Sequence, residues 1–205
     1  MINAVLMFRR NRSRILDLRA VYTLMIDKVP LLQGQLDEVL RAQLIQTVSS
    51  FDTFIHDCVR IGIVRQFVNS GLSSNSLKNY PIPYDDFCAI NAIPNINDKA
   101  LYLSGVIKRI NTKDSYQSPV SVEYALGLIG VDKLWARVSP GMRMTANDVK
   151  LKLANIVNRR NKIAHESDLD ALGLSLNPIT LAEVDDVLTF IYGLVIQIFH
   201  IMCVH

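Results

Sequence analysis

Residues 145–168, TANDVKLKLANIVNRRNKIAHESD, read as one amphipathic helix that ends in a polar cluster. Thr145 is a good N-cap residue, and the carboxylate of Asp148, three residues later, lies where the N-terminus of a helix is positive. Apolar side chains then recur at helical spacing, at Val149, Leu153, Ile156, Val157, Ile163 and Ala164. This period predicts a helix that lies on an apolar core.

Arg160 falls in the middle of that apolar stripe, between Ile156 and Ala164. An unpaired charge is costly in a dry core, so its guanidinium must face a polar cleft or meet a partner. Asn161 and His165 are four residues apart and share a second face, roughly 100° round the helix from Arg160. The two faces can meet in one cleft if the helix ends or bends near Ala164, or if a second subunit completes the site.

The pattern Arg160-Asn161, three residues, His165 resembles the Arg-polar-x-x-x-His signature of the HEPN superfamily, whose members are small all-helical domains and often metal-independent ribonucleases. The phrase RRNKIAHE, the long apolar helix before it and the apolar last helix most resemble the RiboL-PSP-HEPN branch. The resemblance covers residues 35–205. It implies an all-α, HEPN-like helical bundle with long antiparallel core helices and an apolar C-terminal helix, and it implies a homodimer.

The rest of the chain also favours helices. A first helix is predicted over residues 9–28, within an N-terminal helical arm of residues 1–34, and residues 35–205 form the HEPN-like domain. The longest pattern covers residues 35–69, and the Ser- and Asn-rich residues 70–83 are predicted to be a loop. Shorter helices are predicted over residues 84–93, 97–110, 119–130 and 131–141, the 131–141 segment as a short helix or a turn, and the last helix over residues 180–204.

The last predicted helix has eighteen residues, 187–204, without Asp, Glu, Lys or Arg. This is barely long enough to cross a membrane. Gln197 and His200 lie within it and no basic flank follows, so we expect no stable membrane insertion. A helix buried by its own domain and by a partner subunit fits better.

The composition limits which kinds of functional site and which cellular location we expect. The three cysteines are widely spaced and the four histidines are not grouped with metal-ligand spacing, so we expect neither a metal site nor a cofactor. The N-terminus is apolar before it is basic, the reverse of a secretory signal, and we predict no cleaved targeting segment and a cytoplasmic location. The net charge of +3 does not by itself indicate nucleic acid.

The motif residues suit metal-free cleavage of RNA by its own ribose 2′-OH. His165 would act as base or acid near neutral pH. Arg160 would hold the phosphate and its transition-state charge, and Asn161 would orient either group. One chain offers one such histidine, and the pairing implied by the HEPN resemblance would supply two. Flanking phosphates would be bound by Arg159, Lys162 and Lys152.

Other interpretations stay open. The resemblance suggests a toxin or phage-defence effector, with a possible antitoxin or regulatory partner. Some HEPN toxins have a modified tyrosine two residues after the histidine, where this chain has Ser167, so we do not predict that regulation. The alternative is a non-catalytic HEPN-like module that binds RNA or protein and dimerises.

Two further regions are basic. The arm carries Arg9, Arg10, Arg12, Arg14 and Arg19, and the region of residues 97–116 carries Lys99, Lys108, Arg109, Lys113, Tyr102 and Tyr116. Each is either a solvated helix face or a surface for RNA phosphates and bases. His56, beside apolar neighbours, is predicted to be structural rather than catalytic.

Overall fold

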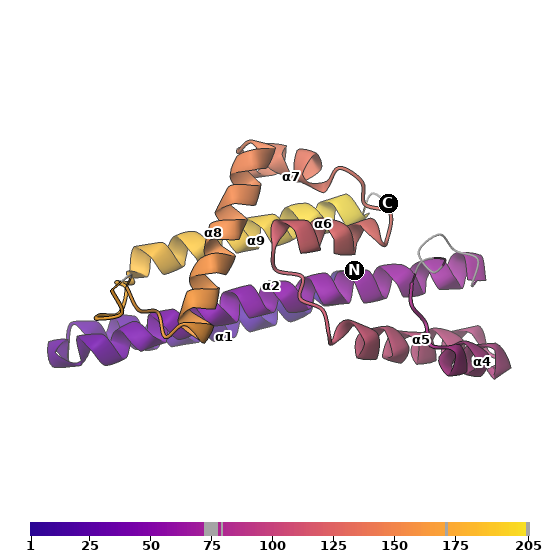
Figure 1. Cartoon of the computed structure of the whole chain (residues 1–205), viewed down its shortest axis with the longest axis horizontal. Coiled ribbons are helices and arrows are strands. Elements are labelled where there is room, and N and C mark those ends of the chain that lie inside the picture. Colours follow the sequence, from indigo (N-terminus) through magenta and orange to yellow (C-terminus); the bar gives the residue numbers. More distant parts are fainter. Residues whose placement is uncertain (72–77, 79, 171, 204–205) are drawn as a thin grey trace.

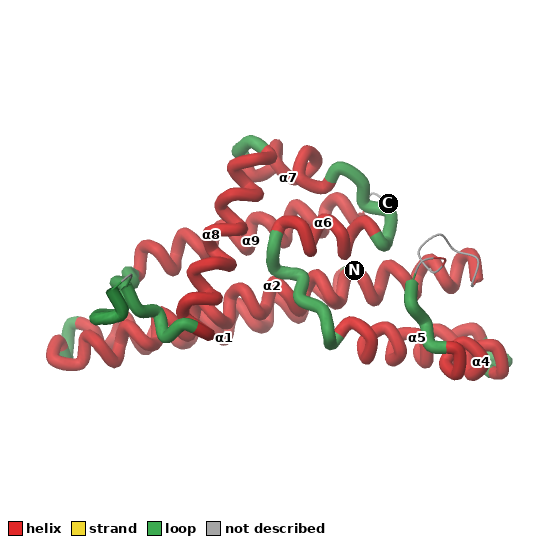
Figure 2. The backbone as a smooth tube through the Cα atoms, in the orientation of Figure 1, coloured by secondary structure: helices red, strands yellow, loops and turns green. Residues whose placement is uncertain are grey.

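A computed structural model of the chain describes all of it except residues 72–77, 79, 171 and 204–205. The described part is helical, with loops between the helices (Figure 2), and outside its helices it holds only an isolated bridge between Leu169 and Leu176. The predicted all-α fold is confirmed. Half of the predicted 70–83 loop, residues 72–77 and 79, lies outside the described residues.

Helix α2 (Gln33–Ser70) crosses the whole molecule, and the other helices gather around it (Figure 1). Helix α1 (Ile2–Ile26) leads through the short 3₁₀ turn Pro30–Leu32 into α2, which runs back along α1, so the two form a long antiparallel pair. The rings of Phe8 and Phe54 meet edge to face with centroids 6.1 Å apart. Helix α1 begins earlier than the predicted residue 9, because Ala4, Val5 and Phe8 are buried in the same core.

Helix α9 (Leu181–Cys203) lies against α2 and α7 and closes the bundle. By length and composition it could cross a membrane, and half of its most apolar window is buried inside the protein. Its fully buried residues are Val184, Ile191, Leu194, Val195 and Ile198. A core position therefore accounts for the apolar sequence of this helix.

Four shorter helices complete the body. Helix α5 (Ile96–Asn111) lies beside the C-terminal half of α2, and α4 (Tyr84–Ala92) packs on α5 (Figure 1). Helix α6 (Pro119–Gly127) contacts α2, and α7 (Leu134–Met142) contacts α9 and the motif helix. The start of α6 agrees with prediction, because the hydroxyl of Ser118 accepts a hydrogen bond from the Ser121 N–H at 3.1 Å. Trp135, which we expected in the core, is buried.

The motif helix is α8 (Ala146–His165). The hydroxyl of Thr145 accepts the N–H of Asp148 at 3.1 Å, so the predicted N-cap is confirmed. The predicted stripe is buried as far as Ile156 and Val157, but Ala164 is exposed, which is a correction to the sequence analysis. In the last turn of α8, Ile163 still packs against the core, whereas Ala164 and His165 face solvent.

Candidate active site

Arg160, Asn161 and His165 lie in the last two turns of α8. The Nη1 of Arg160 donates to the Oδ1 of Asn161 at 3.0 Å, and both side chains are half-buried. The Nε of Arg160 is buried and has no hydrogen-bond partner among the described residues. The helix therefore brings the arginine and the asparagine into direct contact.

His165 is the last residue of α8 and is exposed. Within the part of the chain that the structure describes, no hydrogen bond or ion pair links it to Arg160 or Asn161. The helix stops at once after it, since Ser167 and Asp168 have left-handed backbones with φ of 56° and 52°. The expected helix end is present, but in one chain it leaves the histidine without either motif partner.

Asp168 anchors the segment that follows the motif. It is 1% exposed, and its Oδ2 accepts the Nε of Arg41, on α2, at 2.8 Å. Its Oδ1 accepts the Nη1 of Arg159, and its backbone N–H donates to the carbonyl oxygen of Lys162 at 3.0 Å. Two guanidinium groups thus compensate one buried carboxylate and fix the end of α8 against α2.

Arg41 makes further contacts that hold the same segment. Its Nη2 donates to the carbonyl oxygen of Asn177 at 2.7 Å, and its Nη1 lies 3.0 Å from Glu38. Sequence analysis missed Arg41 and Asp168. A charged residue beside Leu40 in an apolar helix was an available signal for Arg41, but nothing in the sequence identifies a partner 127 residues away.

The model of one protein family, RiboL-PSP-HEPN, matches residues 9–203 of this chain. The chain belongs to the RiboL-PSP-HEPN family. Comparisons with curated proteins and with solved structures found no match. Domains of the HEPN type generally cleave or bind RNA and commonly dimerise. The match confirms the family, while the signature in RRNKIAHE stays a prediction. It also includes most of α1, whose assignment to a separate arm stays a prediction.

The three predicted phosphate-binding residues of this HEPN domain have different surroundings. Arg159 contacts Asp168 and donates to the carbonyl oxygen of Pro178 at 3.0 Å, so its guanidinium already has partners. Lys152 lies 2.7 Å from Asp186. Lys162 is exposed. Together with Asn155, Asn158, Arg159 and Asn177 it lines a cavity of about 240 Å³.

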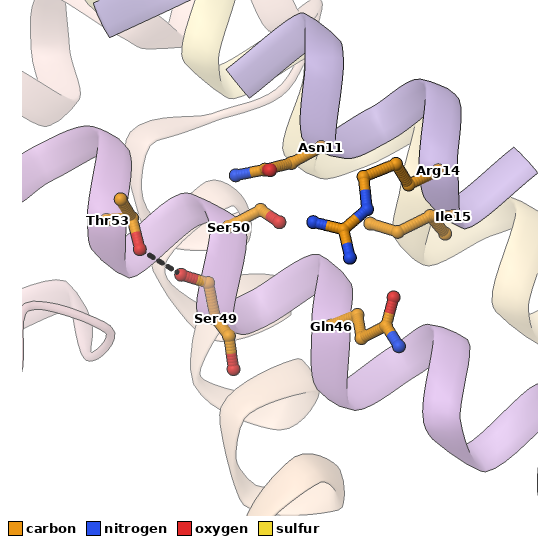
Figure 3. A pocket seen from close by; sticks show the side chains of 7 residues that line it. All are labelled: Asn11, Arg14, Ile15, Gln46, Ser49, Ser50 and Thr53. Carbon is orange, nitrogen blue, oxygen red and sulfur yellow. Dashed lines mark hydrogen bonds between the residues drawn. The ribbon is translucent and has the colours of Figure 1, made fainter. Parts of the chain in front are cut away.

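Two of the arginines in the basic run of α1 contact side chains of α9. Arg19 forms a two-pronged ion pair with Asp185, and the guanidinium carbon of Arg12 lies 4.6 Å from the ring centroid of Tyr192. Figure 3 shows Arg14 in a cavity of about 250 Å³ between α1 and α2, which is also lined by Asn11, Ile15, Gln46, Ser49, Ser50 and Thr53. The arm therefore packs on its own chain, and Arg14 faces a polar hollow.

In the described part of the HEPN domain, no group of three or more His, Cys, Asp or Glu side chains is placed to hold a metal ion. The side chains at the end of α8 are instead a guanidinium, an amide and an imidazole. These groups donate hydrogen bonds, neutralise phosphate and carry protons. The expected absence of a metal and of a cofactor stays a prediction.

Proposed function

We propose that this chain is a metal-independent endoribonuclease whose active site forms between two copies of the chain. The observation that carries the proposal is the family signature at the surface end of α8, with Arg160 bound to Asn161 and His165 exposed as the last helical residue. Each copy would contribute one arginine, one asparagine and one histidine.

In the proposed reaction, the 2′-OH of the ribose attacks the neighbouring phosphorus while one histidine takes its proton. The bond from phosphorus to the 5′-oxygen breaks, and the other histidine gives that oxygen a proton. The products are a 2′,3′-cyclic phosphate and a 5′-OH end. Histidine suits both steps near neutral pH, and the guanidinium of Arg160 stabilises the charge on the phosphorane-like transition state.

A single chain provides His165 for only one of the two proton transfers. Two-fold pairing supplies the second histidine, and it brings the two exposed helix ends together. Lys162 lines the cavity beside the motif, and it could bind phosphate without giving up an ion pair to another described residue. Lys152 and Arg159 would exchange Asp186 and Asp168 for phosphate. The biological role that we propose is that of a cytoplasmic toxin or phage-defence effector.

A cleavage assay in EDTA tests the proposal. Total RNA is incubated separately with wild type, Arg160→Ala, His165→Ala and the control His200→Ala, and the fragment ends are mapped. His200 is an exposed histidine on α9. We expect wild type and His200→Ala to leave cyclic phosphates, and the two motif variants to lose cleavage while remaining folded and dimeric. Unchanged cleavage by His165→Ala would contradict the mechanism.

Binding of RNA without cleavage by any of these proteins would favour the non-catalytic module. Expression in cells then separates that module from an enzyme that waits for an activator. A dormant ribonuclease is expected to arrest growth through His165, whereas a binding module has no such dependence on the histidine.

A further inference from the structure

Helices α2 and α5 enclose a groove of about 550 Å³ that the proposed active site does not use. Its α2 side consists of Thr53, His56, Asp57 and Arg60, and its α5 side of Leu101, Ser104, Gly105, Lys108, Asn111 and Thr112. These residues recur at intervals of three or four, so each helix presents one continuous face to the groove. The core contact of α5 is a separate face, formed by Leu103, Val106 and Ile107.

The groove carries more positive than negative charge. Arg60 donates to the Ser104 hydroxyl at 2.9 Å and to Asp57 at 2.7 Å, which joins the two walls and neutralises the carboxylate of the groove. Lys108 is exposed and has no hydrogen bond or ion pair among the described residues. Its ammonium group is therefore available to an anion. The ring of His56 packs against the ring of Tyr116, with the two centroids 4.5 Å apart. The Nε2 of His56 lies 3.7 Å from the Oδ1 of Asp52.

The groove wall also holds a donor without an acceptor. Asn111 is 3% exposed, and its Oδ1 accepts the hydroxyl of Tyr80, but its Nδ2 has no hydrogen-bond partner within the described part of the chain. Buried amide groups are nearly always hydrogen-bonded, so an unmet donor in a cavity wall indicates a missing acceptor. The hydroxyls of Thr53 and Thr112 donate to backbone carbonyls, which leaves their oxygens free to accept.

We propose that this groove binds a single-stranded segment of the RNA substrate, with a phosphate at Lys108 and Arg60. The inference rests on the proposed function for the identity of the ligand as RNA. The α5 wall from Leu101 to Thr112 is about 16 Å long at 1.5 Å per residue, which is more than a lone phosphate or mononucleotide fills. Apolar surface at Leu101 and Gly105 beside cations suits bases joined to phosphates, and the threonine oxygens suit ribose 2′-OH donors.

Gly105 allows the groove to be blocked without damage to the core. A Cβ built there meets no atom within 4 Å, so a leucine side chain extends into the groove, and a helix interior favours leucine over glycine. Gly127, the last residue of α6, is equally open and does not line the groove. Gly127→Leu is therefore a matched control, and Lys28→Ala, which changes an exposed lysine after α1 that does not line the groove, is the control for Lys108→Ala.

The variants are made in the cleavage-inactive His165→Ala protein, and the binding of a short fluorescent single-stranded RNA is measured by anisotropy. We expect Gly105→Leu to raise Kd about tenfold, because the leucine fills space that a nucleotide of the RNA would occupy, and Lys108→Ala to raise Kd and flatten its salt dependence. Gly127→Leu and Lys28→Ala are expected to bind like the parent. Unfolding temperatures show that each variant is folded.

Equal RNA affinity in Gly105→Leu and Gly127→Leu would overturn the proposal, as would an absence of RNA binding by the parent. Loss of AMP binding in Gly105→Leu with unchanged RNA binding would also overturn it, in favour of a free nucleotide site. The two proposals fail separately. A false groove leaves wild-type cleavage intact, and a false ribonuclease leaves the binding difference between the glycine variants intact.

Discussion

The guanidinium of Arg41 and the carboxylate of Asp168 form an ion pair across the end of the motif helix, with the Nε and Oδ2 atoms 2.8 Å apart and both side chains buried. This pair joins the first half of the long helix α2 to the segment directly after His165. Because Asp168 also contacts Arg159, the position of the α8 end depends on one carboxylate.

Removing that carboxylate should destabilise the fold strongly. Asp168→Ala leaves Arg41 buried without its compensating charge, so we expect the free energy of unfolding to fall by about 3–5 kcal/mol. Denaturant unfolding measures this. Asp186→Ala, which breaks the exposed pair with Lys152, should change it by less than about 1 kcal/mol. Similar values for the two variants would contradict the central role of Asp168.

Asn161 should act on cleavage through Arg160 if the proposed function is correct. Asn161→Ala removes the acceptor of a charge-assisted hydrogen bond worth roughly 1.5 kcal/mol, so we expect the cleavage rate to fall about tenfold. Asn147→Ala changes an exposed asparagine at the other end of the same helix and is the control. Rates are compared under single-turnover conditions, and equal rates for the two variants would exclude a positioning role for Asn161.

The loop after the motif should respond to acid through Asp170. Its carboxylate accepts the Ser175 hydroxyl and the N–H groups of Leu174 and Leu172, and these hydrogen bonds hold the pKa of Asp170 below its usual range. The stabilisation is therefore complete above the unfolded pKa of about 3.9 and is lost as the pH falls through the lower folded pKa.

We expect the amide NMR signals of Leu172 and Leu174 to shift as the pH falls below about 4. Asp170→Asn keeps an acceptor oxygen but removes the titration, so its signals should not follow this pH dependence. The same shifts in both proteins would show that another group causes them.

Gly62 should be required for packing rather than for flexibility. A Cβ at this position of α2 would lie 2.8 Å from the Cγ2 of Ile129, and Gly62 is buried, so the side chain of Ile129 would have to move. We expect Gly62→Ala to lower the free energy of unfolding by about 1–3 kcal/mol. Gly34→Ala, at an open position of the same helix, should be neutral or stabilising.

A double variant checks the cause. Ile129→Ala removes the atoms that the new methyl group meets, so Gly62→Ala should cost less in that background than in the wild type. Additive losses of unfolding free energy would assign the effect of Gly62→Ala to something other than this contact.

Local patterns were sufficient to predict the helices, because apolar period, caps and breakers act over a few residues. The Thr145 cap and the start of α6 at Pro119 are confirmed for this reason. The surface position of Ala164 was not predicted, since helical period gives the face of a residue but not where the neighbouring core ends. The packing role of Gly62 was not predicted either, because its contact with Ile129 joins segments that are distant in the sequence.

The sequence predicted which helix end carries the candidate site residues, but it did not predict the contacts around them. The spacing in RRNKIAHE places Arg160, Asn161 and His165 on one helix end, where the structure has them. The ion pair between Arg159 and Asp168 depends on a turn in which two residues have left-handed backbones. Neither of these residues is glycine, so the sequence does not indicate the turn. The roles of these residues in catalysis and RNA binding stay predictions.

Three of the four side chains in the last turn of α8 face solvent, and only Ile163 packs against the core, so the proposed reactive residues of this turn contribute little to the stability of the fold. Lys162, Ala164 and His165 are exposed, so substitutions at these positions give up little buried apolar surface. The chain can then vary its chemistry or substrate preference at this end without approaching its stability threshold. Three residues after His165 the situation reverses, because Asp168 is buried and paired with Arg41 and Arg159, and a change in any one of the three removes a partner from a buried charge.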